Sequence, residues 1–224
     1  MLNDVRTKAL VLRRTNYGEA DRILNLLTPE GKISAIAKSV RKEKSKLAGG
    51  IEMFSLIDVV VHQGKSEMGT ITSAKMIKFY SHIMTDFSRM ELAALILKKA
   101  ASSQSDMDFA KLFESVVDVF EKLDQGEDLE LIETWFWFNF VKASGEEVNL
   151  YRDTNGNKLV EGETYTWDFQ EVALRPEPQG KISTNEIKLM RLMLTAKLAI
   201  VCKVQNAANL VKEISYIAKA INKI

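Results

Sequence analysis

The sequence predicts an α+β protein, in which a small five-stranded β-barrel is followed by a mainly α-helical domain with a small hairpin-like insertion. Five β-compatible runs separated by turn residues fill residues 1–80. Apolar residues at helical spacing dominate residues 81–224, apart from a polar stretch at about 145–180 that is punctuated by Gly and Pro. We therefore predict two domains, 1–80 and 81–224, with a boundary near residues 80–87.

The predicted strands are short; residues 32–37 alternate polar with apolar residues, as half-buried strands do, and residues 57–62 are rich in β-branched Val and Ile. They cover residues 7–14, 22–28, 32–37, 57–62 and 69–77. Turn residues separate them, notably at 16–18 and 29–31. Five such strands favour an OB-fold, a barrel that binds oligonucleotides on one face, although other small barrels fit the same pattern.

Helix starts are indicated by capping residues ahead of apolar stripes. Ser88 with Glu91, and Ser183 with Glu186, have the spacing of capping boxes. Single caps are expected at Asp106 and Asp128. The Ser183 box should open a helix over 187–201, and a last helix is expected over 206–221.

The third predicted helix is aromatic on every side over residues 135–140, with the sequence WFWFNF. A helix that is apolar all round is normally buried, so we interpret this cluster as core. The alternative is an exposed groove that accepts an apolar peptide from a partner.

The two predicted domains differ in charge. Residues 1–80 carry 14 Lys and Arg against 8 Asp and Glu, whereas residues 81–224 carry 17 against 22. Five of the cations lie in one predicted loop, 38–46, with a single acid. Clustered cations neutralise phosphates and release counterions, so we favour nucleic-acid binding over a merely solvated charge run. Tyr17 is the aromatic residue of the barrel most suited to stacking on a base.

Catalytic patterns are weak, and we expect no enzyme and no cofactor. His62 and His82 have no evident partner pattern, and Glu19 with Asp21 is better explained by ion pairs or caps than by a divalent metal site. Phosphate-binding glycine motifs are absent from the sequence. The single Cys202, in an apolar stretch, is expected to be buried. Without a long apolar run or a secretion signal, we expect a cytoplasmic protein with no membrane partner.

The N-terminal residues resemble the opening of the bacterial RecO family of recombination mediators. The resemblance rests on residues 9–14 (ALVLRR), 17–24 (YGEADRIL), 27–38 (LTPEGKISAIAK), Arg41, 45–50 (SKLAGG), Glu52 and Phe54. It implies an OB-fold followed by a helical domain, together with binding of single- and double-stranded DNA, strand annealing and help in loading recombinase. It also implies two partners, RecR and the acidic C-terminal tail of single-stranded DNA-binding protein.

The expected DNA-binding residues are the basic positions within these motifs and their loop. The resemblance carries over Arg13, Arg14, Arg22, Lys32, Lys38, Arg41 and Lys46, and Lys42 and Lys44 are added on charge alone.

The sequence departs from the family pattern in two places. Many RecO proteins hold zinc with four cysteines, but the corresponding residues 151–178 contain no cysteine, so we predict no zinc. The hairpin is expected to be held instead by packing of Tyr165, Trp167 and Phe169. Ser39 stands where the family favours Gly.

Two functions from different classes remain at this point. The leading hypothesis is a DNA-binding and strand-annealing mediator that makes and breaks no bond. The alternative is a protein-interaction scaffold of the repair machinery with weak or no DNA binding.

Overall fold

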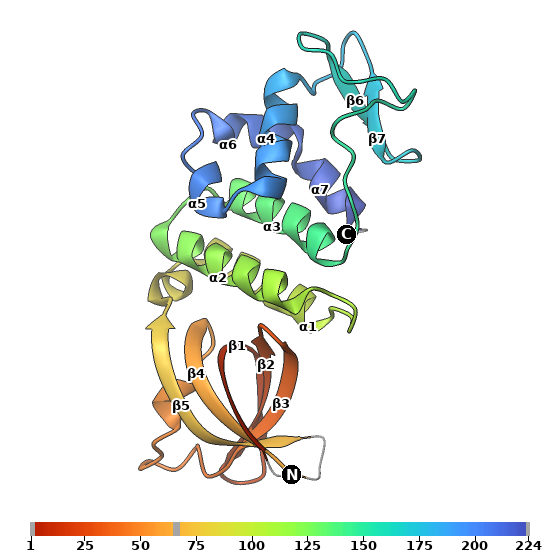
Figure 1. The fold of residues 1–224 in the computed structure, drawn as a ribbon. Coiled ribbons are helices and arrows are strands. Elements are labelled where there is room, and N and C mark those ends of the chain that lie inside the picture. The colour runs from red at the N-terminus through yellow and green to blue at the C-terminus, as the bar shows by residue number, and fades with distance from the viewer. Residues whose placement is uncertain (1–2, 65–67, 223–224) are drawn as a thin grey trace. The chain divides into compact units, whose positions relative to one another are not determined.

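The computed structural model describes residues 3–64 and 68–222, and the chain divides into two compact units. Unit 1 is Met1–Asp124 and unit 2 is Gln125–Ile224. Strands give way to helices at the boundary predicted near residues 80–87, but compact unit 1 continues through two further helices to Asp124 (Figure 1). The two units are described separately below.

Unit 1 contains a closed five-stranded barrel, which confirms the predicted OB-fold (Figure 1). Its strands are β1 (Asn3–Tyr17), β2 (Asp21–Thr28), β3 (Gly31–Ala37), β4 (Ser55–Gln63) and β5 (Gly69–Phe79). The strand order is β1-β2-β3-β5-β4, and β1 closes the barrel by pairing with both β2 and β4. All pairings are antiparallel except that of β3 with β5, which is parallel. All five predicted strands are present, and β1 is longer than expected because it continues through Tyr17.

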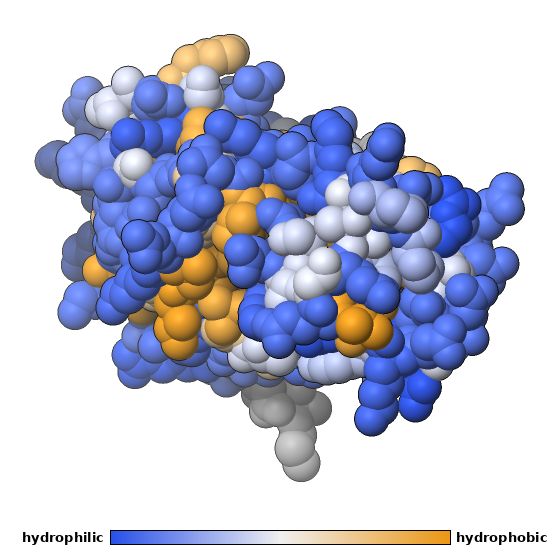
Figure 2. All heavy atoms as spheres, turned by 90° about the horizontal axis from the view of Figure 1, so that it is seen from above, coloured by the Kyte–Doolittle hydropathy of each residue, from blue (hydrophilic) through white to orange (hydrophobic). Residues whose placement is uncertain are grey.

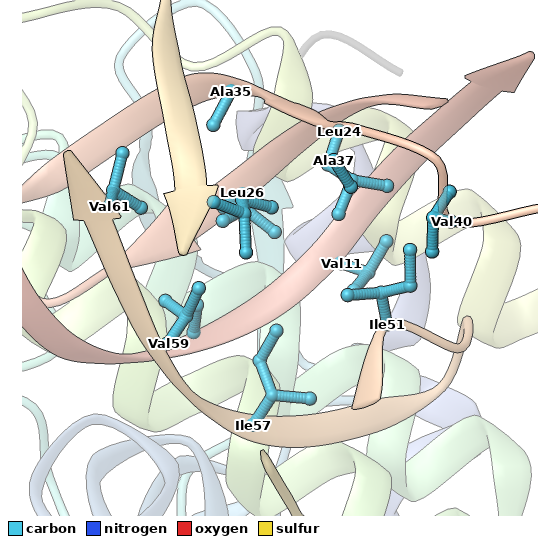
Figure 3. Packing of buried hydrophobic residues seen from close by; sticks show 12 residues of the cluster. Val11, Leu24, Leu26, Ala35, Ala37, Val40, Ile51, Ile57, Val59 and Val61 are labelled. Atoms are coloured by element: carbon cyan, nitrogen blue, oxygen red, sulfur yellow. The ribbon is translucent and has the colours of Figure 1, made fainter. Parts of the chain in front are cut away.

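Alternate residues of the strands fill the barrel with aliphatic side chains that point toward one another (Figure 3). The cluster consists of Ala9, Val11, Leu24, Leu26, Ala35, Ala37, Val40, Ile51, Ile57, Val59, Val61 and Ile71. Burial of each larger side chain stabilises the fold by about 1.5–3 kcal/mol. Val40 and Ile51 come from the connection between β3 and β4, so both ends of that connection are anchored in the core.

Two helices complete unit 1, α1 (Phe87–Ala101) and α2 (Phe109–Gln125). The predicted caps are wrong by two residues in each case. Asp86, not Ser88, accepts a hydrogen bond from the Arg89 amide, and Asp108, not Asp106, accepts one from Lys111. An aspartate placed directly before the first helical residue satisfies an amide that the helix leaves free, and it therefore outcompetes the weaker candidate nearby.

Helix α1 contacts β1 and β2 on the outside of the barrel. Leu10 and Leu27 pair across these strands and are fully buried although they do not belong to the interior cluster. At the end of β5, Tyr80 packs edge-on against Phe120 of α2 with ring centroids 5.5 Å apart. Its hydroxyl donates to Glu121. Burial beside that carboxylate raises the pKa of Tyr80 well above its ordinary value.

Unit 2 is built around α3 (Leu129–Ala143), which begins at the predicted cap Asp128. Trp135, Phe136, Trp137, Phe138 and Phe140 are all buried, which confirms the interpretation of this cluster as core. The other elements are α4 (Thr184–Thr195), α5 (Leu198–Val201), α6 (Ala207–Leu210), the 3-10 helix η3 (Val211–Glu213) and α7 (Ser215–Ile221). Two further 3-10 helices, η1 (Ala48–Gly50) and η2 (Ser81–Thr85), lie in unit 1.

The last two helices of the chain are more interrupted than the sequence predicts. The capping box of Ser183 and Glu186 is present, but α4 ends at Thr195 instead of continuing to residue 201. Ala196 is extended, and its carbonyl accepts a hydrogen bond from the indole of Trp135. The helix expected over 206–221 is broken at Ile214, whose backbone is not helical. Tertiary contacts thus override an apolar periodicity that looks continuous in sequence.

The predicted insertion contains a two-stranded hairpin, β6 (Tyr165–Asp168) and β7 (Ala173–Pro176). Tyr165 and Trp167 are buried as expected. Phe169 is not: it is 58% exposed and touches only the edge of the core at the Tyr216 ring. Val172 has φ +49°, in the left-handed region, and β7 begins directly after it at Ala173.

Among the described residues, none of the helices is long and apolar enough to span a membrane. The face drawn in Figure 2 is mostly hydrophilic, with hydrophobic side chains gathered in smaller patches.

Candidate nucleic-acid interface

The basic loop lies between β3 and η1, and the barrel holds it at several points. Arg41 donates its backbone amide to Ala20 at 2.9 Å, and Val40 is buried in the barrel core. Asp21 accepts a hydrogen bond from the Ser39 amide at 2.6 Å. Ser39 has φ +55°, so a conformation that favours Gly is adopted here by Ser. Asp21 therefore acts as a loop cap, as the sequence suggested, and the loop is fixed at its base.

Four lysines project from this loop, and we call them the loop lysines: Lys38, Lys42, Lys44 and Lys46. All four are exposed, and none of their side chains forms a hydrogen bond or ion pair with a described residue. Glu43 is the one acid between them. Their charge is therefore largely uncompensated and accessible, which is the electrostatic requirement for contacting a phosphate backbone.

Arg13 is a fifth exposed cation without a described partner. The register of β1 against β2 shifts between Val11 and Arg13, and this bulge turns Arg13 outward opposite Asn25. Asn25 in turn pairs with Ser34, whose hydroxyl donates to the Asn25 amide oxygen. The outer face of β1, β2 and β3 at this level is thus polar and carries one free guanidinium.

The other four predicted contacts have partners within the protein. Arg14 forms an ion pair with Glu52, and Arg22 donates to the Asn16 side chain at 3.2 Å. Arg41 donates to the Gly18 carbonyl at 3.2 Å, which ties the loop to the β1–β2 turn. Carbonyl and amide partners leave the charge in place, whereas the Glu52 carboxylate neutralises that of Arg14.

Lys32 has a clear structural task. Its ammonium donates to the carbonyls of Ala101 at 2.8 Å and Ser103 at 2.6 Å, at the C-terminal end of α1. The last carbonyls of a helix lack intrahelical partners, and a cation there interacts favourably with the helix dipole. Lys32 therefore fastens α1 to β3, and its three donors are largely committed.

A second basic group was missed by the sequence analysis. Lys8, Asp58 and Lys75 lie directly opposite one another across β1, β4 and β5, and both lysines are exposed. Arg6 hydrogen-bonds Asp58 and, together with the charges of the two lysines, holds the pKa of Asp58 below its ordinary value. Strand alternation could have placed these residues outside the barrel, but only the register brings them into one row.

Tyr17 is exposed, as expected, at the end of β1. Phe54 is buried and packs edge-on against Phe120. Among the described residues of the barrel strands, Tyr17 (55% exposed) and Phe79 (38% exposed) are the aromatic side chains open to stacking.

The histidines have carboxylate neighbours that the sequence analysis failed to find. His62 lies 2.6 Å from the Asp4 carboxylate across β1 and β4, and Nδ1 of His82 lies 3.7 Å from the Asp124 carboxylate. Pairing register and helix packing create these contacts, so spacing along the chain could not reveal them. Each pair is exposed and lacks a hydrogen-bonded Ser or Cys nucleophile among the described residues.

The residues of the insertion do not fit a zinc site. Residues 151–178 contain no cysteine, and the described residues include no group of three or more His, Cys, Asp or Glu side chains that could hold a metal. The buried carboxylate of Asp153 instead accepts the amides of Asn155 at 2.9 Å and Asn157 at 2.8 Å. The Thr154 amide donates to Leu174 of β7, and Leu174 is fully buried. Hydrogen bonds thus close the turn at residues 153–157 and connect it to β7.

Comparison with known proteins covers both parts of the chain. A family model described as Recombination protein O N terminal matches residues 1–80, and one described as Recombination protein O C terminal matches residues 90–221. A DNA repair protein RecO of Dehalococcoides mccartyi (strain CBDB1) is 29% identical over 233 residues, which cover 97% of this chain and 89% of that protein.

Two other relatives carry the same name. That of Alkaliphilus metalliredigens is 28% identical over 227 residues, covering 98% of this chain and 90% of its own length. That of Heliobacterium modesticaldum is 39% identical over 109 residues, covering 48% and 40%. With both family models matched in order and an OB-fold barrel followed by helices, this chain belongs to the RecO family of DNA repair proteins.

Proposed function

We propose that this protein binds single- and double-stranded DNA through the phosphate backbone, anneals complementary strands and helps load recombinase, without catalysing a reaction. The observation that carries the proposal is the set of four exposed loop lysines that have no partner among the described residues. Arg13, also without a described partner, adds to this charge on the same barrel.

Binding of this kind draws its free energy from counterion release. Each phosphate that a lysine neutralises frees condensed cations, so affinity depends steeply on salt and little on sequence. A lysine ammonium is a point charge on a flexible stem and contacts phosphates without a fixed geometry. Val40 and Ile51 anchor the loop in the barrel core, and the four lysines lie within nine consecutive residues, so one backbone can meet several of them.

Annealing follows from the same charges. Two complementary strands repel each other through their phosphates, and cations that reduce this repulsion let bases meet and pair. The protein needs no group that attacks, protonates or oxidises DNA for this purpose. RecR and the acidic tail of single-stranded DNA-binding protein are the partners we propose, in the cytoplasm, with no cofactor.

An annealing assay tests the proposal. Two complementary oligonucleotides carry a fluorescence donor and acceptor, and their pairing rate is measured with the protein, with and without single-stranded DNA-binding protein. The wild-type chain should accelerate pairing, and Lys42→Ala/Lys44→Ala should lose most of that acceleration. The matched control is Lys197→Ala/Lys203→Ala, which removes two exposed lysines of unit 2 that have no described partner. A wild-type chain that neither binds DNA nor speeds pairing would instead favour the scaffold alternative.

A further inference from the structure

A small basic pocket lies in unit 2. It encloses about 350 Å³ and is lined by Tyr151, Arg152, Lys158, Leu159 and Arg191. Three of these five residues are cations and none is an acid. A volume of a few hundred cubic ångströms is within the range of small-ligand sites.

The side chains of the three pocket cations have no carboxylate partner among the described residues. Arg152 donates to the Gly156 carbonyl at 2.7 Å, and Arg191 donates twice to the Leu150 carbonyl, at 3.0 and 2.6 Å. Lys158 has no partner among the described residues. Four other cations of the same unit face carboxylates instead, in the pairs Arg175–Asp168, Lys181–Glu213, Lys188–Glu161 and Lys219–Glu133. The pocket therefore gathers three cations that no described carboxylate neutralises.

The backbone also forces two of the cations together. Arg152 and Lys158 are directly opposite each other in an isolated antiparallel bridge. Residues opposite each other in such a bridge project from the same face, and like charges there destabilise the pairing. An anion placed between them would remove this repulsion, so the arrangement is suited to an anionic ligand.

Tyr151 gives the pocket an aromatic surface. Its ring is 4.5 Å from the Arg191 guanidinium and remains 63% exposed. An exposed ring beside unpaired cations matches a nucleotide, which presents a phosphate and a flat base together. We propose that this pocket holds one nucleotide of a single-stranded nucleic acid, with a phosphate against Arg152 and Lys158 and the base against Tyr151. The proposal rests on the proposed function in that the chain binds nucleic acid, but it assigns a separate site in a different unit.

Binding of a labelled oligothymidylate to the full chain tests this assignment. Lys158→Ala should lower the salt slope of log affinity by about 0.7, the value for one phosphate of a single strand. Tyr151→Ala should weaken binding by about fivefold to about 150-fold at constant slope, because stacking contributes roughly 1–3 kcal/mol per base. Tyr151→Phe keeps the ring and should restore affinity. Lys203→Ala, an exposed lysine of the same unit without a described partner, should change neither quantity.

Crosslinking gives a result that a mere loss of stability cannot imitate. An oligothymidylate with one 5-iodouracil, irradiated on the wild-type chain, should attach to the peptide that contains Tyr151. If Lys158→Ala and Tyr151→Ala bind like wild type and no such peptide appears, while Lys42→Ala/Lys44→Ala still weakens binding, the pocket assignment is wrong and the barrel proposal stands. If only the pocket variants weaken binding, the barrel proposal fails and the pocket stands. If Lys158→Ala and Tyr151→Ala weaken binding of an acidic peptide but leave binding of oligothymidylate unchanged, the nucleotide assignment is also wrong.

Discussion

Lys32 and Lys38 are both basic residues of the expected interface, yet the structure gives them different tasks. The Lys32 ammonium donates to two carbonyls at the end of α1, at 2.8 and 2.6 Å, whereas Lys38 has no described partner. We predict that Lys32→Met destabilises unit 1 and leaves the salt dependence of DNA binding almost unchanged. Lys38→Met should do the reverse.

The magnitude follows from the contacts that are lost. Hydrogen bonds of a charged donor contribute about 1.5–3 kcal/mol in protected positions, and a cation at a helix C-terminus about 0.3–1 kcal/mol. Because Lys32 is exposed, we expect a loss at the lower end, about 1–2 kcal/mol in all. With a urea slope of about 1–3 kcal/mol per molar, the unfolding midpoint should fall by roughly 0.3 to 2 M.

Urea unfolding followed by far-ultraviolet circular dichroism measures this change. The chain provides an internal control, because its three tryptophans, Trp135, Trp137 and Trp167, all lie in unit 2. Tryptophan fluorescence should therefore report a smaller shift than circular dichroism. The reasoning is refuted if Lys32→Met keeps its stability and lowers the salt slope as much as Lys38→Met does.

The remaining predictions concern the core, pH and metal content. Leu26→Ala, at a fully buried position of the barrel, should lower the free energy of unfolding by about 2–5 kcal/mol in urea titrations, and no loss would mean that the barrel core is misplaced. Because the pKa of Tyr80 is raised in the folded protein, its contribution to the free energy of unfolding is fully present below the ordinary tyrosine pKa of about 10. That contribution is lost as pH rises above this value. Tyr80→Phe should therefore flatten the fall of stability at alkaline pH, and an unchanged pH profile would contradict the burial of that phenol. Purified protein should contain no stoichiometric zinc by elemental analysis, since Asp153 binds backbone amides, and one zinc per chain would show that another ligand set forms.

Local patterns predicted the fold class and most elements because the physics involved is local. The alternation of Ile57, Val59 and Val61 marks one face of a strand whatever its partner is, and all three are buried in the barrel. The predicted helix ends were wrong where a contact between residues far apart in sequence determines where a helix stops. Trp135 holds the carbonyl of Ala196 and ends a helix whose apolar period continues in sequence.

The candidate interface was predictable only as a set of charges. Composition identified the basic loop, but it could not separate Lys32, which caps α1, from the free loop lysines. Cross-strand register also could not be inferred, so the row of Lys8 and Lys75 beside Asp58 was missed. The same limitation hid the pocket cations, because Arg152 and Lys158 meet only through the register of an isolated bridge.

The salt dependence of duplex DNA binding tests the central claim most directly. It compares wild type with Lys42→Ala/Lys44→Ala, and with Arg14→Ala, whose charge Glu52 already neutralises. If the loop lysines contact phosphates, the double variant should lower the slope of log affinity against log salt by about 1.8, and Arg14→Ala should lower it by much less. Equal slopes for wild type and the double variant would contradict the account.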